Sequence, residues 1–334
     1  MPHRARAAVF TAPGEVEVRE IIVPDPAPGE VLVRTEASII SNGTEIWIWG
    51  GRFHSPGRST PYTYPVVPGY QRVGIVEALG DGVTSLRPGQ RVAATVSRLE
   101  GVPCSFTGSH AELGVTVEGE CIPVPDDVAP EDVAGLVLTQ VGYNGGTRPP
   151  VEAGTSVVVL GDGLVGQWAA QAFMARGAHV VLCGRRDRRL ELGLEHSAHE
   201  VVDARTTDIE AWVRERYPDG VDIVDEAVGR LANVELAFRL LRHDGHLVFN
   251  GYHPEGEHLM SIQWMHDKEI TCWGLAGWTA PRMLATLGWI REGKLNVREI
   301  VTHEFPGTEA DRAYRMIRDR SDDFLGVLLR WGNR

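Results

Sequence analysis

One segment constrains the fold of this chain more than any other, namely TSVVVLGDGLVGQWAAQAF at residues 155–173. The apolar run at 156–160 predicts a buried strand, and the run that follows the glycines predicts a helix. The spacing G-x-G-x-x-G suits a tight turn, close approach of the backbone to a pyrophosphate, and packing of helix on strand. In this context it indicates a dinucleotide site at the helix N-terminus, the alternative being a glycine-rich turn without a ligand. The predicted cofactor-binding residues here are Gly161, Gly163, Leu164, Val165 and Gly166.

The pattern of the remaining chain changes near residue 130. Residues 1–130 contain short strand-like runs separated by turn clusters such as PDPAPGE, GDGV and RPGQ, which predicts a β-barrel-like domain. From Pro130 strand-like and helix-like segments alternate, which predicts a parallel sheet with crossover helices. After residue 277 come a helical segment and a strand-like tail. The predicted fold class is therefore α/β, with a β-barrel domain and a doubly wound parallel-sheet domain.

Charge and composition exclude several classes of function. The formal net charge of -12 argues against nucleic acid or an anionic membrane as a partner, because no basic face is suggested that would attract phosphates. No apolar run approaches the roughly 18 residues of a membrane span, and the start of the chain lacks the apolar core of a signal peptide. We therefore expect a cytoplasmic protein with a small-molecule substrate. The four cysteines are scattered without a C-x-x-C pair, so neither a structural zinc site nor a disulfide framework is expected.

The end of the second predicted strand of the parallel sheet indicates the type of cofactor. An NAD enzyme would offer a carboxylate here to the ribose 2′-hydroxyl, but the sequence has Gly184 followed by Arg185 and Arg186. Guanidinium groups suit a 2′-phosphate, so NADP(H) is the predicted cofactor. Two alternatives stay open: the arginines form a solvated helix start, or Asp187 binds the ribose as a displaced acid.

These segments together resemble the medium-chain dehydrogenase/reductase superfamily over nearly the whole chain. The likeness includes EVLVRTEASIISNGTE, GYQRVGIVEALGDGVTSLRPGQRVA, LLRHDGHLVFNG and the tail LNVREIVTHEFPGTEADRAYRMI. In detail, SNGTE, the Gly69-Tyr70-Gln71 turn and GWTAPRMLATLGWI are most similar to the zinc-lacking branch that includes relatives of bacteriochlorophyllide a dehydrogenase. The resemblance implies a GroES-like catalytic domain at 1–130, completed by 278–334, and a Rossmann NADP-binding domain at 131–277. It also implies a homodimer joined along the strand in KEITCWGLAG.

The resemblance also bears on metal binding. In the zinc members a cysteine stands at the position of Asn42, and a histidine and a glutamate stand at those of Tyr70 and Gln71. Their third ligand comes from the segment that corresponds to LVLTQVGYNGG, which has no Cys, His, Asp or Glu. Catalytic zinc needs about three nitrogen, sulfur or carboxylate ligands. We therefore expect no metal in this chain.

Without zinc, a hydrogen-bond donor must stabilise the developing oxyanion or enolate. The predicted catalytic residues are Tyr70 at the former metal position, then Thr44, where zinc members relay protons through a hydroxyl, and Asn42. The alternatives are a packed aromatic ring for Tyr70 and a turn-capping hydroxyl for Thr44. Glu45 is expected to pair with an arginine near the cofactor, and His110 to be a loop residue.

Aromatic side chains with a few polar groups predict a pocket for a ring-bearing substrate. By resemblance, residues 45–65 border the cleft, and the strand that ends at Asn250 approaches the nicotinamide, so Asn250 is a predicted cofactor contact. For each residue taken alone, ordinary packing or a solvated loop is the alternative. The predicted substrate residues are Trp47, Trp49, His54 and Trp278.

Three functions remain open from the sequence. Loss of zinc favours reduction of a conjugated C=C bond, which needs less electrophilic help than reduction of a ketone. The likeness to the bacteriochlorophyllide dehydrogenase branch favours alcohol/ketone interconversion, which we prefer because the likeness includes the tail as well as the turn. A protein that binds NADPH without catalysis is the third possibility. The sequence does not name the substrate.

Overall fold

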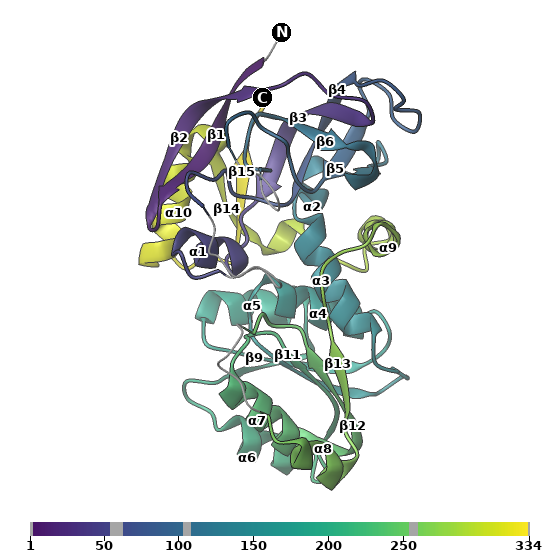
Figure 1. The fold of residues 1–334 in the computed structure, drawn as a ribbon. Helices are drawn as coiled ribbons and strands as arrows, with labels where there is room; N and C mark the ends of the chain where they lie inside the picture. Colours follow the sequence, from purple (N-terminus) through teal and green to yellow (C-terminus); the bar gives the residue numbers. More distant parts are fainter. Residues whose placement is uncertain (1–2, 54–62, 103–107, 254–259, 333–334) are drawn as a thin grey trace. The chain divides into compact units, whose positions relative to one another are not determined.

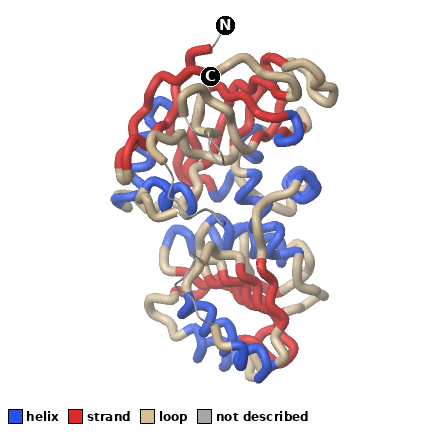
Figure 2. The backbone as a smooth tube through the Cα atoms, in the orientation of Figure 1, coloured by secondary structure: helices blue, strands red, loops and turns tan. Residues whose placement is uncertain are grey.

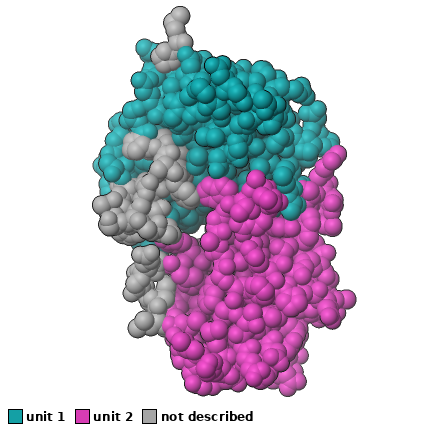
Figure 3. Space-filling model, turned by 45° about the vertical axis from the view of Figure 1, so that its right-hand side comes forward, with its two compact units in different colours: residues 1–137, 283–287, 301–334 teal, residues 138–282, 288–300 magenta. Residues whose placement is uncertain are grey.

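The computed structural model describes residues 3–53, 63–102, 108–253 and 260–332. The chain divides into two compact units (Figure 3). Unit 1 consists of residues 1–137, 283–287 and 301–334, and unit 2 consists of residues 138–282 and 288–300. Residues 131–137, expected in the Rossmann domain, therefore belong to unit 1. Residues 278–282 and 288–300, expected in the catalytic domain, belong to unit 2. Within the described ranges, no helix is both long and apolar enough to cross a membrane.

Unit 1 contains a sheet with the strand order β14-β15-β3-β4-β5-β7, in which β6 also pairs with β3, and a separate hairpin of β1 and β2. Strands β14 and β15 come from the C-terminal tail, and Leu328 of β15 pairs with Ile39 of β3, so the tail completes a sheet begun by N-terminal residues (Figure 1). The strands are β1 (His3–Ala12), β2 (Glu15–Val23), β3 (Glu30–Ile39), β4 (Arg72–Leu79), β5 (Arg91–Ala94), β6 (Leu113–Val117), β7 (Cys121–Pro123), β14 (Val301–Pro306) and β15 (Gly326–Arg330). The helices are α1 (Thr44–Trp49), α2 (Pro130–Val133) and α10 (Ala310–Asp319).

The apolar face of α10 forms part of the core of unit 1. Its buried residues are Ala310, Ala313, Tyr314 and Ile317, and their spacing of three and four puts them on one side of the helix. This face belongs to the same buried cluster as Phe10 of β1. Residues from the two ends of the chain therefore share one core.

Unit 2 is a parallel sheet of six strands with helices on both faces (Figure 2). Helix α4 packs on one face through Ala169 and Phe173, and α7 packs on the other through Ala237 and Phe238. The strands are β8 (Ser156–Leu160), β9 (His179–Gly184), β10 (Glu200–Asp203), β11 (Val221–Glu226), β12 (Leu241–Phe249) and β13 (Thr271–Gly274). The helices are α3 (Leu136–Thr147), α4 (Leu164–Met174), α5 (Asp187–His196), α6 (Ile209–Arg216), α7 (Leu231–Leu240), α8 (Ile262–Lys268) and α9 (Ala280–Arg291), of which α3 and α9 extend into unit 1.

The strand order of unit 2, β10-β9-β8-β11-β12-β13, locates its ligand-binding edge. The chain adds β9 and β10 on one side of β8 and then β11, β12 and β13 on the other, so the winding reverses between β8 and β11. Their last residues, Leu160 and Glu226, pair in register. Open parallel sheets bind ligands outside the carboxyl ends of the strands at such a point. The predicted fold class, α/β with a doubly wound parallel sheet beside a β domain, is confirmed.

Candidate active site

The glycine motif forms an open loop between β8 and α4. Gly161 has a φ of +126°, which favours glycine. A Cβ at Gly166 would lie 2.0 Å from the carbonyl oxygen of Gly161, whereas a Cβ at Gly163 would have no atom within 4 Å. Helix α4 begins at Leu164 without a side-chain cap, so the N–H groups of its first turn are left for a ligand. The loop therefore fits a pyrophosphate, because it combines unused donors with open space at Gly163.

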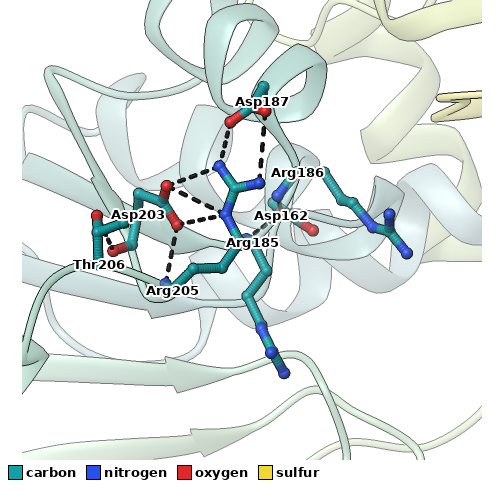
Figure 4. Close-up of polar contacts among 7 residues, drawn as sticks. All are labelled: Asp162, Arg185, Arg186, Asp187, Asp203, Arg205 and Thr206. Carbon is teal, nitrogen blue, oxygen red and sulfur yellow. Dashed lines mark hydrogen bonds and ion pairs between the residues drawn. The ribbon is translucent and has the colours of Figure 1, made fainter.

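Asp162, which the motif leaves unspecified, connects this loop to the end of β9. Its Oδ2 accepts the backbone N–H of Arg185 at 2.7 Å and that of Arg186 at 3.0 Å (Figure 4). A Cβ at Gly184 would lie 2.4 Å from the same oxygen. The Asp162 carboxylate therefore occupies the space that a side chain at position 184 would need. Sequence reasoning missed Asp162, although an acid inside an otherwise apolar loop was a usable signal.

The side chains of Arg185 and Arg186 point away from the carboxylates drawn around them (Figure 4). Within the described part of the chain, neither guanidinium forms an ion pair. Arg205 instead pairs with Asp203 at 2.7 Å and with Asp187. The hydrogen bonds from Arg205 lower the pKa of Asp203 to about 2. Asp187, the alternative ribose acid, thus has its carboxylate bonded to Arg205, and the two arginines remain available.

Asn250, expected near the nicotinamide, follows β12 and is nearly buried. Its Nδ2 donates to Oδ2 of Asp225 at 3.1 Å. Asp225 and Glu226 are fully buried at the end of β11. Burial raises the pKa of Asp225 to about 8. The hydrogen bond from Asn250 lowers this pKa, and the charge of Glu226 raises it. Asp225 is therefore mostly protonated at neutral pH. The sequence VDIVDEAVG did not predict this, because it does not indicate that Asp225 is buried.

In unit 1, the residues at the expected metal positions form hydrogen bonds within the protein. The phenol of Tyr70, 4% exposed, donates to Oγ of Ser41 at 2.7 Å, and Thr44 is its second hydrogen-bonding neighbour. Burial raises the pKa of Tyr70 far above its usual value, with a further contribution from the charge of Glu45. The phenol therefore keeps its proton. Asn42 donates through Nδ2 to the carbonyl of Leu325 at 2.6 Å.

Glu45 lies at the centre of a buried network, not beside an arginine as expected. Its Oε2 accepts hydrogen bonds from Nε2 of His110 at 2.9 Å and from the phenol of Tyr314, and its Oε1 accepts the N–H of Ser41 at 3.0 Å. His110 is also fully buried, and its Nδ1 lies 2.8 Å from Oγ of Ser38. The expectation for Glu45 is therefore wrong, whereas His110 lies in a loop as expected but is buried there; both belong to a core network that joins α1 to α10.

The donor atoms at these positions do not fit catalytic zinc. The phenol of Tyr70 and the amides of Asn42 and Gln71 are neutral groups, and each donates a hydrogen bond within unit 1, that of Gln71 to the carbonyl of Ile39 at 3.1 Å. Zinc sites use imidazole, thiolate or carboxylate ligands. Among the described residues, the one cluster of three such side chains is His243, Asp244 and Glu269, all exposed and all in unit 2.

The predicted substrate residues have different environments. Trp49 is 2% exposed and packs with Phe10, at a ring-centroid distance of 6.1 Å, and with Tyr314 at 5.9 Å. Its expected place in a substrate wall is therefore wrong, and it belongs to the core of unit 1. Trp47 and Trp278 are partly buried, the former below the guanidinium of Arg52. His54 lies outside the described residues.

Both units match protein families. Residues 27–126 match the family described as alcohol dehydrogenase GroES-like domain, and residues 165–290 match the family described as zinc-binding dehydrogenase. These two families define a dehydrogenase that combines a GroES-like domain with a Rossmann-type domain. The chain belongs to the medium-chain dehydrogenase/reductase superfamily.

Similar proteins extend over the full length of the chain. An alcohol dehydrogenase from Cupriavidus necator is 25% identical over 97% of this chain and 98% of its own. The 2-desacetyl-2-hydroxyethyl bacteriochlorophyllide A dehydrogenase of Cereibacter sphaeroides is 28% identical over 98% of both chains. Among solved structures, a protein from Sinorhizobium meliloti assigned as a zinc-binding dehydrogenase and bound to NADP superposes with a TM-score of 0.86 at 22% identity. That superposition covers 98% of this chain and 100% of the other.

Proposed function

We propose that this protein is an NADP(H)-dependent oxidoreductase that interconverts an alcohol and a ketone on a ring-bearing small molecule without zinc. The observation that carries the proposal is the open glycine loop of unit 2, which lies beside two arginine side chains that form no ion pair with a carboxylate among the described residues. The NADP-bound state of the Sinorhizobium meliloti protein supports the choice of cofactor.

In this proposal the cofactor is held mainly by backbone groups. Gly161, Gly163 and Gly166 keep the loop open, and the N–H groups of Leu164 and Val165 at the start of α4 bind the pyrophosphate. The 2′-phosphate pairs with the guanidinium groups that extend beyond Gly184, namely those of Arg185 and Arg186. Asn250 contributes at the nicotinamide end. Bound NADP(H) supplies the chemistry of hydride transfer.

On the substrate side, the neutral hydroxyls of unit 1 replace a metal ion. Tyr70 keeps its proton and donates to Ser41, whose own proton is then free to be passed on. Thr44 is the partly exposed member of this group. We infer that the three hydroxyls move a proton to or from the developing alkoxide, and that preorganised donors of this kind stabilise its charge. Asn42, bonded to the carbonyl of Leu325, fixes the start of the segment that holds Ser41 and Thr44.

The names of two relatives favour alcohol chemistry. One is an alcohol dehydrogenase, and the other acts on a hydroxyethyl-bearing bacteriochlorophyllide, which is a ring system. Reduction of a conjugated C=C bond is the second candidate. It is favoured by the neutral donor set at Tyr70 and Asn42, because such a reaction needs less electrophilic help than reduction of a ketone.

The test of the proposed function uses purified protein with NADPH and NADH as ligands, followed by turnover on a panel of cyclic ketones, secondary alcohols and enones. We expect tighter binding of NADPH than of NADH and oxidation of NADPH with members of the ketone panel. Turnover with enones alone would replace the first candidate by the second. Binding of NADPH without any turnover would leave a cofactor-binding protein and remove both enzymatic functions.

We also propose that two copies of this chain form a homodimer in the cytoplasm. Strand β13 (Thr271–Gly274) is an edge strand of the sheet in unit 2, and Thr271 is exposed on it. Exposed edge strands pair readily with a second copy, and two-fold dimers are the commonest oligomers. Light scattering at micromolar concentration tests this proposal, and a monomer would contradict it.

A further inference from the structure

We propose that Asp162 is a positioning residue that sets the preference for a 2′-phosphate, because it holds the backbone from which Arg185 and Arg186 extend. The inference rests on the proposed NADP(H) function and names the residue that makes the arginine pair selective. The G-x-G-x-x-G pattern itself requires no acid at its second position.

The contacts of Asp162 show what its carboxylate holds. Oδ2 accepts two consecutive N–H groups, from Arg185 at 2.7 Å and from Arg186 at 3.0 Å, directly before α5 begins. Oδ1 lies 3.7 Å from Nη1 of Arg189 in the first turn of α5. One carboxylate thus fixes both the end of β9 and the start of α5 relative to the glycine loop.

The same contacts argue against Asp162 as a ribose ligand. Its side chain is only 12% exposed, and its oxygens face the two N–H groups and Arg189. An acid that binds ribose in the manner of NAD enzymes would project from position 184. There a Cβ would lie 2.4 Å from Oδ2 of Asp162, so Asp162 excludes that acid. It therefore disfavours the NAD arrangement and orders the backbone that presents the arginines.

This arrangement predicts a selective effect on one part of the cofactor. Hydrogen bonds to an ionised acceptor are stronger than those between neutral groups. When they are lost, residues 185 and 186 must be ordered at the moment of binding, which weakens the contact of their side chains with the 2′-phosphate. The pyrophosphate should be unaffected, because its donors belong to α4 and not to the β9–α5 connection.

The test compares Asp162→Ala and Asp162→Asn with the parent by measuring dissociation constants for NADPH, NADH, adenosine 2′,5′-bisphosphate and 5′-AMP. We expect Asp162→Ala to weaken NADPH and the bisphosphate by about tenfold, since two charge-assisted bonds are lost. NADH and 5′-AMP should change by less than about twofold. Asp162→Asn keeps an oxygen that can accept both N–H groups, so it should retain most of the preference. The loss of a catalytic group would lower kcat, whereas kcat at saturating NADPH should not fall in either Asp162 variant.

Asp187→Asn is the matched control, because it removes one negative charge from the same region while leaving the bonds of Asp162 intact. It should not weaken binding of the 2′-phosphate, so a loss equal to that of Asp162→Ala would mean that charge alone is responsible and would overturn the inference. If Asp162→Ala does not fold, Gly184→Ala gives the same test, since its methyl group would displace the carboxylate. Retained phosphate preference in a folded Gly184→Ala protein would likewise overturn it.

Two further outcomes are decisive. Equal weakening of all four ligands by Asp162→Ala would show that Asp162 supports the loop as a whole, and tighter binding of NADPH would show that its charge repels the phosphate. Either result overturns the inference. If the parent itself binds the bisphosphate no better than 5′-AMP, the proposed NADP(H) function fails and the inference fails with it. The parent therefore separates failure of the function from failure of the role given to Asp162.

Discussion

The candidate cofactor site in unit 2 and the candidate catalytic cluster in unit 1 are built in opposite ways. The proposed cofactor site consists of backbone groups and of guanidiniums that form no ion pair among the described residues, from two contiguous segments, 161–166 and 184–186. The catalytic cluster consists of the hydroxyls of Tyr70, Ser41 and Thr44, which bond within the protein, and the N–H of Ser41 connects it to the buried network of Glu45. The N–H groups and guanidiniums of the first site are open to a ligand, whereas the side chains of the second site form hydrogen bonds within the protein.

This difference predicts how substitutions should act. Removing an unpaired group in unit 2 deprives a ligand of a contact and leaves the folded protein intact. Removing a member of the buried network in unit 1 leaves polar groups without partners, and each such group carries a desolvation penalty. We therefore expect affinity to respond in unit 2, and stability and turnover to respond in unit 1.

Glu45→Ala should have the largest effect. It leaves the buried side chains of His110 and Tyr314 without their common acceptor, so we expect a loss of about 3–5 kcal/mol in the free energy of unfolding. Chemical denaturation measures this loss. Glu20→Ala is the matched control, because Glu20 forms an exposed pair with Arg4 and should contribute less than about 1 kcal/mol. Equal effects of the two variants would contradict the central role of Glu45 in the network.

Tyr70→Phe keeps the ring and removes the donor to Ser41. If the hydroxyl cluster stabilises the alkoxide, kcat should fall by about 10²–10³, the usual effect of losing one preorganised donor. NADPH affinity should stay within about twofold, since the proposed site for the cofactor phosphates belongs to unit 2. Tyr64→Phe is the control, because that phenol donates to the backbone carbonyl of Ile48 and not to a hydroxyl. Turnover of Tyr70→Phe equal to the parent would reduce Tyr70 to a packing residue and leave the proton to Thr44 or water.

Replacing Arg185 and Arg186 by alanine should weaken NADPH far more than NADH. Each charge-assisted contact with phosphate contributes about 1.5–3 kcal/mol, which corresponds to about 10- to 100-fold in affinity. Fluorescence titration measures both constants. Arg188→Ala provides the control, since Arg188 forms an exposed pair with Glu191 one turn along α5. Equal weakening of both cofactors by the double variant would show that the arginines do not contact the 2′-phosphate.

Asp225→Asn should change the pH dependence of stability. The folded-state pKa of about 8 lies above the ordinary value of 3.8, so the protonated form favours the fold. The stabilising contribution is complete below about pH 4 and is lost as the pH rises towards 8, because the unfolded state then releases the proton more readily. In the Asp225→Asn variant, the free energy of unfolding should therefore fall less than in the parent as the pH rises from about 4 to 8. Unfolding curves at several pH values measure it, and an identical decline in parent and variant would show that Asp225 is not the responsible group.

The two sites also differ in how far the sequence predicts them. The fold class and the glycine loop were predictable because their signals are local: an apolar strand, glycines at fixed spacing, and a helix within about 20 residues. Asp162 was visible as an acid in an otherwise apolar loop but received no role, because the motif leaves its position free. Its bond to the β9–α5 connection becomes visible only when two loops meet in space.

The buried network of unit 1 lay beyond sequence reasoning for a different reason. Glu45, His110 and Tyr314 are far apart in the chain and lack any pattern of spacing, so no local rule brings them together. The same applies to Trp49, whose position in an aromatic-rich segment suggested a substrate wall while its burial against Phe10 makes it part of the core.

Hydride transfer with NADP(H) but without zinc is what we propose for this protein, and metal analysis combined with turnover measurements tests it. The measurement determines zinc per chain by elemental analysis and follows NADPH oxidation on a responsive substrate before and after treatment with a chelator. We expect far less than one zinc per chain and a rate that the chelator leaves unchanged, because Asn42, Tyr70 and Gln71 offer no imidazole, thiolate or carboxylate ligand. About one zinc per chain, together with activity that is lost on chelation and restored by added zinc, would contradict it.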